Sequence, residues 1–333
     1  MINTVETFIS VLVIAYKRKQ FLYQALNSLT EQTLDKNYYE IAVITDFEVL
    51  DEKNFIEKGI IFFRDERKEY CKKMSSVIGS LKGNVICILD DDDLFFAEKL
   101  STIFKIFSEN EDISFVQNNM CIIGKNGEVI RERFYSFPNE LVNVKSEIDS
   151  YGYFKKLFKM KFGFNGSSIS VRKEVITQNI EILSLMSGSV EAFLWLSSIS
   201  QGKKSYFENN ILTAYRIHDD NNSVALLNEK RRGSMYKRHL SDWKSLYNIP
   251  MSEDKKWLID VIKEQTIYLE IMNEIFSSKP NKQRMFSFIK SFYFNYKLSF
   301  SVKIISIIGF TISLLSVNLS RYYFGFISTI LWK

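Results

Sequence analysis

The chain has 333 residues, 46% of them hydrophobic and 25% charged, which is enough for one large or two ordinary globular domains. Three prolines and 13 glycines exclude a fibrous or low-complexity protein, and three cysteines without a CxxC spacing favour a reducing compartment over a disulfide framework. Eight of the 44 basic residues and none of the 39 acidic ones follow Glu274, so the residues up to that point carry a net −3. This asymmetry predicts an anionic partner for the basic tail, either a membrane or a nucleic acid.

The first third of the chain alternates predicted strands with predicted helices. Apolar runs predict strands at 8–15, 41–45, 60–63 and 85–89, and helical spacing of apolar residues predicts helices at 21–32, 67–82 and 94–107. No basic segment precedes the first run, so we interpret it as a strand and not as a signal peptide. The alternation predicts an α/β fold with a mostly parallel, doubly wound sheet.

Beyond residue 110 this alternation is lost. Strands are predicted at 113–116, 120–123, 129–134, 167–171 and 205–215, with a hairpin turn at 125–128. Helices are predicted at 146–159, 173–178, 190–200, 229–247 and 252–276, and a loop at 219–223.

Four adjacent carboxylates, Asp90, Asp91, Asp92 and Asp93, follow the apolar run 85–89 directly. They repel one another, and a divalent cation is the obvious counter-charge, because magnesium is usually held by one or two carboxylates together with substrate phosphates. Open α/β sheets bind ligands outside the carboxyl ends of their strands. The pattern therefore predicts a metal-assisted phosphate site, and the alternative is a solvated acidic turn that caps the next helix.

Six stretches stand in a recognisable order. They are FISVLVIAYKRKQFLYQALNSLTEQT, VITDFEVLD, GNVICILDDDDLFFAEKL, FGFNGSSISVRKEVI, SVEAFLWLSSISQGKKSYF and LTAYRIHDDNNSV. The first three resemble the nucleotide-sugar half of inverting family 2 glycosyltransferases, and the last three resemble the acceptor half. The resemblance implies a GT-A fold with a Rossmann-like sheet over residues 1–225, divided into halves at 1–110 and 111–225. A helical extension at 226–278 and a basic, aromatic tail at 279–333 would follow.

The resemblance also implies a metal site. Asp90 and Asp92 match the family's Asp-any-Asp motif, in which Asp92 would bind Mn²⁺ or Mg²⁺ directly. Asp90 would contact the ribose or metal-bound water, and Asp91 or Asp93 would orient its neighbours. His218, in the YRIH stretch, would complete the metal shell, and the alternative is an ordinary histidine in a surface loop. The metal would neutralise the departing nucleoside diphosphate.

Glu191 is the candidate general base. Aligning the LWL stretch with the family motif Glu-Asp-x-Asp-Leu-Trp-Leu puts Glu191 on the usual catalytic aspartate, one methylene longer. An inverting transfer needs a base close to the acceptor hydroxyl. The alternative is a glutamate that merely interacts with the dipole at a helix N-terminus.

Four further residues match or replace positions that bind the nucleotide. Tyr16 would stack on the base, and Asp46 would accept a hydrogen bond from a ring N–H. Lys73 would supply a cation facing phosphate, with core packing or a solvated charge as alternatives. Arg216 would contact phosphate or form a structural ion pair. Lys17 departs from the family, because asparagine is usual at its position.

The tail predicts a membrane-associating helix. Its apolar segment 304–319 is 16 residues long, short of the about 20 needed to span a bilayer. Small residues (Ser306, Gly309, Ser313, Ser316 and Ser320) share one helical face and large apolar residues the other, so we expect the helix to lie in the membrane interface. A second apolar stretch at 322–332 would make a re-entrant hairpin, and packing on the body or on another subunit is the alternative. A nucleic-acid role is disfavoured, since no RNA-binding module is visible.

Three functions remain open on this basis. The first is a metal-dependent inverting glycosyltransferase that transfers a sugar from a nucleoside diphosphate sugar to a hydroxyl acceptor. We expect a lipid-linked or cell-envelope glycan as acceptor, at the cytoplasmic face of the cell membrane. The second is a nucleotidyltransferase on a related sheet, although YKRKQ after the first strand lacks the glycines of a triphosphate loop. The third is a non-catalytic, membrane-bound relative that binds a glycan or a sugar nucleotide.

Overall fold

The computed structural model describes residues 6–133, 139–142, 165–219, 229–295 and 300–332. Its contacts divide the chain into two compact units. The first holds the described parts of Met1–Lys145 and Met160–Ile217, with Ile249–Met251, and the second holds those of His218–Asn248 and Ser252–Lys333. The helix expected at 146–159 and most of the loop expected at 219–223 lie outside the described residues.

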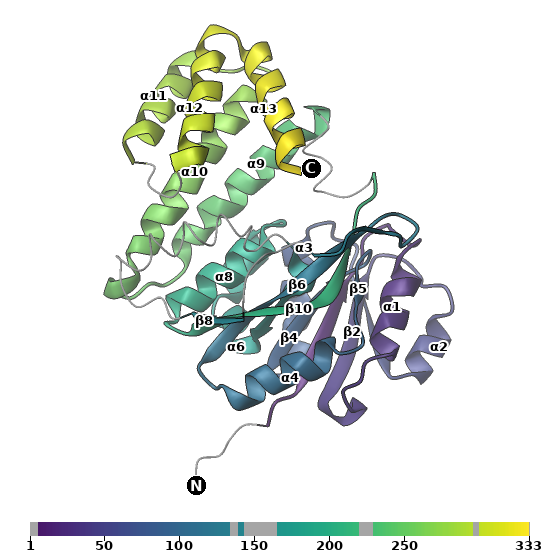
Figure 1. Ribbon diagram of the computed structural model, residues 1–333. Coiled ribbons are helices and arrows are strands. Elements are labelled where there is room, and N and C mark those ends of the chain that lie inside the picture. The colour runs from purple at the N-terminus through teal and green to yellow at the C-terminus, as the bar shows by residue number, and fades with distance from the viewer. Residues whose placement is uncertain (1–5, 134–138, 143–164, 220–228, 296–299, 333) are drawn as a thin grey trace. The chain divides into compact units, whose positions relative to one another are not determined.

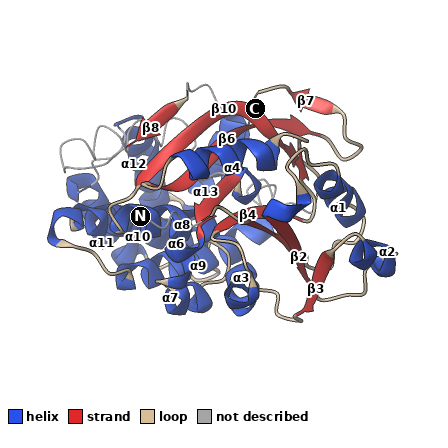
Figure 2. Cartoon of the chain, turned by 90° about the horizontal axis from the view of Figure 1, so that it is seen from below, coloured by secondary structure: helices blue, strands red, loops and turns tan. Residues whose placement is uncertain are grey.

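The first unit is built on one twisted sheet with helices on both sides (Figures 1 and 2). Its strands are β1 (Ile9–Ile14), β2 (Tyr39–Thr45), β3 (Ile60–Arg64), β4 (Val85–Asp90), β5 (Leu94–Phe95), β6 (Ile113–Ile123), β7 (Val129–Arg131), β8 (Glu140–Val142), β9 (Ile169–Arg172) and β10 (Lys204–Arg216). Its helices are α1 (Leu22–Thr30), α2 (Glu52–Glu57), α3 (Tyr70–Val77), α4 (Lys99–Glu109), α6 (Lys173–Thr177), α7 (Ile180–Leu185) and α8 (Val190–Ser200).

The strand order is β3-β2-β1-β4-β9-β6-β10-β5. The first four strands are parallel, β9 is antiparallel to both of its neighbours, and β6 is parallel to β10. The expected mostly parallel sheet is confirmed. The strand β2 follows β1 on one side, whereas β4 lies on the other side of β1, so the direction in which strands are added reverses at β1. Open α/β sheets bind ligands at such a switch point. The register places Ile14 beside Asp90 at that edge.

Alternation along the central strands fills both faces of the sheet. Val13 of β1 and Leu89 of β4 belong to a core cluster with Leu26 of α1 and Ile103 of α4. The intervening residues, such as Leu12, are equally inaccessible to solvent. These strands are therefore apolar on both sides, as expected for a sheet covered by helices on two faces.

Two predictions about the first unit need correction. The helix expected from residue 94 begins only at Lys99, because Leu94 and Phe95 form β5 and pair with β10. The strands expected at 113–116 and 120–123 are one strand, β6. Its polar centre stays in the strand because the buried amide of Asn118 is satisfied, accepting from Lys99 and donating to Thr213 Oγ1 at 3.0 Å.

The second unit is helical. It contains α9 (Glu229–Ser245), α10 (Trp257–Ile275), α11 (Lys282–Asn295), α12 (Phe300–Leu315) and α13 (Val317–Trp332). The small residues expected on one face of the tail helix form a packing surface: Gly309 lies against Phe324 of α13, and its carbonyl accepts a 2.8 Å hydrogen bond from Ser320. The interfacial helix and its alternative, packing on the body or on another subunit, both stay predictions. Among the described residues, no helix is both long and apolar enough to cross a bilayer.

Candidate functional site

The acidic turn at the end of β4 is buried. Asp91 and Asp93 are fully inaccessible, and Asp92 is 3% exposed, so the solvated turn considered as the alternative does not occur. The pKa of Asp90 is raised to about 6 and that of Asp91 to about 8, chiefly because burial removes hydration from the charged forms, and in part because Asp92 is also charged. The turn therefore needs positive charge beside it to stay ionised.

Arg18, in the loop after β1, supplies such a charge. Its guanidinium forms ion pairs with one carboxylate oxygen of Asp91 and one of Asp92. Burial disfavours the charged guanidinium, but Asp91 and Asp92 outweigh this and raise the pKa of Arg18 above its usual value. The switch point between β1 and β4 explains the contact, because the loops that follow these neighbouring strands meet there.

Tyr70, the first residue of α3, connects the acidic turn to the predicted base. Its hydroxyl donates a 2.8 Å hydrogen bond to Oδ1 of Asp90. Burial raises the pKa of Tyr70 well above its usual value, and the charges of Asp90 and Glu191 raise it further, so the hydroxyl keeps its proton. A Cβ placed on Gly166 would lie 3.8 Å from the Tyr70 hydroxyl and 3.9 Å from Oε1 of Glu191. The structure thus brings Glu191 and the acidic turn to one place.

Glu191 stands in the first turn of α8, after the N-cap residue Ser189. The positive end of the helix dipole favours a carboxylate there. Glu191 is partly exposed. Helix position and accessibility are compatible with a base, and the dipole interaction considered as the alternative is present as well.

Asp93 anchors the turn to the rest of the unit. Its Oδ2 accepts hydrogen bonds from Ser167 Oγ at 2.7 Å and from Asn165 Nδ2 at 3.1 Å, and its Oδ1 accepts from the Arg216 backbone N–H at 2.8 Å. Burial raises the pKa of Asp93 well above its usual value. One side chain thereby ties β4 to the end of β10 and to the segment before β9.

The Arg216 guanidinium lies beneath the turn. Its Nε donates to the carbonyl of Asp92 at 2.8 Å, and its terminal nitrogens donate to the carbonyl of Lys125 at 3.0 Å and to Oε1 of Gln24 at 2.7 Å. Arg216 is fully buried and stacks 4.7 Å over the ring of Phe21. These contacts are those of a structural support for the backbone of the turn.

Tyr16, Asp46 and Lys73 lie together at the end of β1. Lys73 is buried, and its Nζ donates to the carbonyl of Ala15 at 2.8 Å and lies 3.9 Å from Oδ1 of Asp46 and 5.1 Å from the centre of the Tyr16 ring. The backbone N–H of Tyr16 donates to Asp91 at 3.2 Å, which joins this group to the acidic turn. The Lys73 side chain therefore lies at the end of the site that is predicted to bind the nucleobase.

Lys17 has a left-handed backbone, with φ 59°. Asparagine adopts this conformation more readily than lysine does, which explains why asparagine is usual in the matching family position. The Lys17 N–H donates to Oδ1 of Asp46 at 2.9 Å, and this bond holds the strained turn in place. The departure from the family leaves the backbone geometry intact.

Asp90, Asp92 and Asp93 fit a divalent cation by their chemistry. Each offers one carboxylate oxygen, and the three oxygens lie within 4.8 Å of one another. Hard oxygen ligands suit Mg²⁺ and Mn²⁺. His218, the other predicted ligand, is 7% exposed and is the first residue of the second unit, so its role stays a prediction.

Sequence reasoning missed Arg18, Tyr70 and Asn165. A usable signal existed for Arg18, because it lies two residues beyond Tyr16 in the loop that the switch point places near β4. Tyr70 and Asn165 contact the turn from other parts of the fold. The residues around them in the sequence form no motif that would have predicted these contacts.

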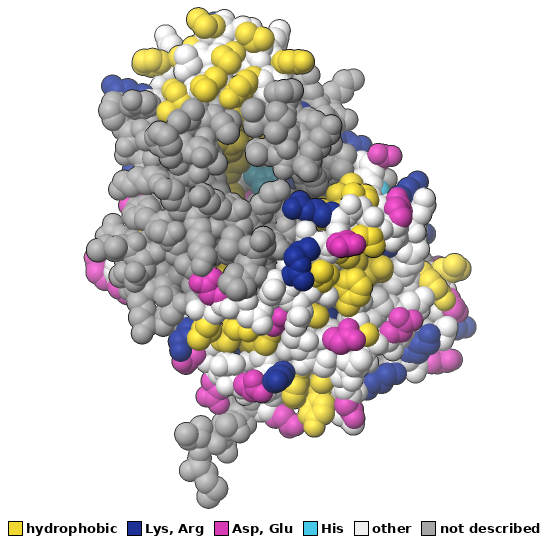
Figure 3. Space-filling view, viewed as in Figure 1, with side chains coloured by type: hydrophobic (Ala, Val, Ile, Leu, Met, Phe, Trp, Pro, Cys, Tyr) yellow, Lys and Arg dark blue, Asp and Glu magenta, His cyan; other side chains and the backbone are white. Residues whose placement is uncertain are grey.

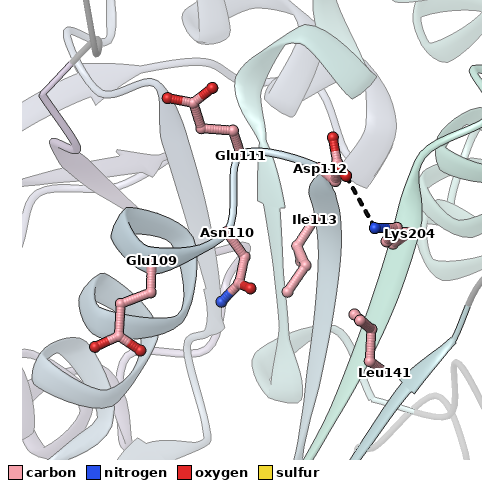
Figure 4. A pocket seen from close by; sticks show the side chains of 7 residues that line it. All are labelled: Glu109, Asn110, Glu111, Asp112, Ile113, Leu141 and Lys204. Carbon is pink, nitrogen blue, oxygen red and sulfur yellow. Dashed lines mark hydrogen bonds and ion pairs between the residues drawn. The ribbon is translucent and has the colours of Figure 1, made fainter.

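A pocket of about 280 Å³ lies elsewhere, at the amino ends of β6 and β10 (Figure 4). Its lining includes Glu109, Leu141 and the ion pair between Lys204 Nζ and Asp112, which are 2.9 Å apart. The amino ends of these strands are opposite the edge that carries the acidic turn, so this pocket is not the donor site.

Known proteins resemble this chain in sequence. The family model described as Glycosyl transferase family 2 matches residues 10–177, half of the chain. An uncharacterized glycosyltransferase of Methanocaldococcus jannaschii is 24% identical over 253 residues, which are 73% of this chain and 83% of that protein. An uncharacterized glycosyltransferase of Haemophilus influenzae is 28% identical over 113 residues, 32% of this chain and 37% of that protein.

Solved structures share the fold. S. aureus TarS 1–349 in complex with UDP-GlcNAc has a TM-score of 0.60 and 14% identity, covering 97% of this chain and 90% of that one. The chain spans about half of a longer S. aureus TarS chain, 54%. Mannosyltransferase PcManGT from Pyrobaculum calidifontis, in complex with GDP-Man and Mn²⁺, has a TM-score of 0.52 and 12% identity, covering 98% and 87%. The expected GT-A fold and enzyme class are confirmed over the two other functions considered, and the chain belongs to glycosyltransferase family 2.

Proposed function

We propose that this glycosyltransferase uses a nucleoside diphosphate sugar and inverts the configuration of the transferred sugar. The observation that carries the proposal is that Gly166 lies close both to Oε1 of Glu191 and to the Tyr70 hydroxyl, which donates a hydrogen bond to Asp90. A base that flanks a phosphate-binding turn is what a direct displacement needs, because the acceptor must approach the sugar from the face opposite the diphosphate.

In the reaction proposed, Glu191 takes the proton of the acceptor hydroxyl. The hydroxyl oxygen forms a bond to the anomeric carbon while the bond from that carbon to the diphosphate oxygen breaks, and the nucleoside diphosphate departs. Tyr16 and Asp46 hold the nucleobase of the donor, and Lys73, which lies beside both, keeps them in position. Holding both substrates in line contributes much of the rate.

Asp92, with Asp90 and Asp93, would hold Mn²⁺ or Mg²⁺, and His218 remains a proposed fourth ligand. The ion would stabilise the negative charge that develops on the leaving diphosphate. Arg18 pairs with the same carboxylate of Asp92, so ion and guanidinium would compete for it. The PcManGT complex with Mn²⁺ supports the choice of metal, by analogy of fold alone.

We propose a lipid-linked or cell-envelope glycan as acceptor, met by a peripheral enzyme at the cytoplasmic face of the cell membrane. The support is the charge of the chain, because all eight charged residues after Glu274 are basic. A basic, apolar tail binds anionic lipid surfaces through charge and burial together.

The test is Asp92→Ala compared with Asp112→Ala, a carboxylate at the opposite edge of the sheet. Wild type and Asp112→Ala are expected to release nucleoside diphosphate from a matching donor, and Asp92→Ala to lose turnover by 100-fold or more, roughly the effect of removing a charge-stabilising group. The donor is found by thermal shift with uridine, guanosine and deoxythymidine diphosphate sugars, with and without Mn²⁺. Unchanged turnover in Asp92→Ala, or release of pyrophosphate, contradicts the proposal.

A further inference from the structure

One end of the helical unit brings two turns together. Arg321 of α13 donates from Nε to the carbonyl of Ile275 at 2.7 Å and from a terminal nitrogen to the carbonyl of Ser277 at 2.5 Å. The turn from α10 to α11 therefore lies beside the turn from α12 to α13. We call this end, with Lys279, Lys282, Leu315, Leu319 and Tyr322, the helical tip.

The tip exposes its large apolar side chains. Leu315 is 81% exposed, Tyr322 75% and Leu319 57%. Hydrophobic side chains gather at this end of α12 and α13 in the space-filling view (Figure 3). Monomeric soluble proteins rarely keep such residues clustered in water, so a cluster of this kind marks a contact surface.

The small residues of the same hairpin are turned inward. Ser313 and Ser320 are fully buried, and Gly309 packs so closely that a Cβ there would lie 2.4 Å from Cζ of Phe324. The seam also holds the large buried rings of Phe310 and Phe324, whose centres are 5.5 Å apart. Leu315 and Leu319 lie outside this seam and stay exposed.

The charged side chains that follow Glu274 in the chain are all basic. Lys279 and Lys282 are exposed, and no acidic residue follows Glu274 in the sequence. Glu274 itself is 8% exposed, and Oε2 accepts from the Asn281 N–H at 3.0 Å. The tip therefore presents apolar side chains and cations together.

We propose that the helical tip docks on an anionic phospholipid bilayer. Leu315, Leu319 and Tyr322 enter the boundary between headgroups and acyl chains, while Lys279 and Lys282 bind lipid phosphates. A second copy of the chain fits less well, because a symmetric contact would place the two sets of cations against each other. The inference shares the membrane location with the proposed function and is independent of its chemistry.

The test is sedimentation of the full chain with vesicles, without substrates. Wild type is expected to bind vesicles of phosphatidylglycerol and phosphatidylcholine, and to bind pure phosphatidylcholine about tenfold less. The apolar variant carries Leu315→Ser, Leu319→Ser and Tyr322→Ser, and its matched control carries Leu50→Ser and Ile56→Ser, at residues 86% and 53% exposed in the first unit. The charge variant carries Lys279→Glu and Lys282→Glu, and its matched control carries Lys53→Glu and Lys105→Glu.

Both tip variants are expected to lose binding to anionic vesicles by about tenfold or more, and both controls to bind as wild type does. Unchanged melting temperatures check that all variants fold, since the replaced side chains are exposed. Wild type that stays in the supernatant, or tip variants that sediment as wild type does, overturn the proposal. A dimer in size exclusion that the apolar variant dissociates, with no vesicle binding, assigns the tip to a contact between copies and overturns it equally.

Discussion

The hydroxyl of Tyr70 donates a 2.8 Å hydrogen bond to the carboxylate of Asp90, and the same hydroxyl lies next to Gly166, which Glu191 also approaches. Tyr70 thus contacts the residue proposed to hold the leaving group and lies near the residue proposed to activate the acceptor. Tyr70 is a positioning residue, because it acts through the carboxylate of Asp90.

Tyr70→Phe removes the donor and leaves the ring in place. The oxygen of Asp90 loses its partner in a buried site, so we expect the free energy of unfolding to fall by about 2 kcal/mol. We expect kcat to fall about tenfold with little change in donor KM, because orientation is lost and binding is kept. Urea denaturation and steady-state kinetics measure the two effects. Tyr23→Phe, at a tyrosine 45% exposed, is the matched control and is expected to change neither.

Glu191→Gln keeps the shape of the side chain and removes its basicity. If Glu191 is the base, kcat falls by a factor of about 10² to 10⁴, and donor binding in a thermal-shift assay is unchanged. Glu191→Asp is expected to retain intermediate activity, since it restores a carboxylate one methylene shorter. Near wild-type turnover in Glu191→Gln would leave only the interaction with the helix dipole as its role.

Arg18→Gln removes the guanidinium that pairs with Asp91 and Asp92. Breaking a buried pair from one side leaves uncompensated charge, so we expect the free energy of unfolding without metal to fall by about 3 kcal/mol. We expect Mn²⁺ to raise the melting temperature of the variant more than that of wild type, because no guanidinium competes for Asp92.

The comparison variant is Arg64→Gln, which removes a more exposed ion pair with Glu52. Surface pairs contribute about 0–1 kcal/mol, so this variant should melt close to wild type and respond to Mn²⁺ as wild type does. Equal Mn²⁺ responses in Arg18→Gln and wild type would argue that the guanidinium and the ion do not share Asp92.

Local patterns predicted the sheet and the acidic turn, because both are written in contiguous residues: the apolar run 85–89 and the four carboxylates after it. The contact of Arg18 with Asp92 needed the strand order, which periodicity does not contain. The small residues around Gly309 could be read from the sequence, but their contact with Phe324 depends on how α12 packs on α13, which the sequence pattern does not contain.

His239 in α9 makes stability depend on pH. Burial, with the charge of Arg238, lowers its pKa to about 4, and Asp242 opposes the shift. Between pH 7.5 and 5.5 the unfolded chain binds a proton at a pKa of about 6.5 that the folded chain does not bind, so the free energy of unfolding falls by about 1 kcal/mol as pH falls. Urea denaturation of wild type and His239→Gln at both pH values tests this. The carboxyl groups titrate in both proteins and cancel in the comparison, so an equal pH dependence would refute the assignment.

Gly309→Ala tests the seam on which the helical tip depends. A Cβ at this position would lie 2.4 Å from Cζ and 2.6 Å from Cε2 of Phe324, and 2.8 Å from Cδ1 of Tyr323. Both rings on the next helix would have to move to make room for the methyl group. We expect this overpacking to outweigh the gain in helix propensity and to lower the free energy of unfolding by about 1–3 kcal/mol. Gly79→Ala, where an added Cβ meets nothing within 4 Å, is expected to leave stability unchanged or raise it by less than about 1 kcal/mol. If the two variants melt alike, α12 and α13 are not packed through Gly309, and the outward position of Leu315 and Leu319 loses its explanation.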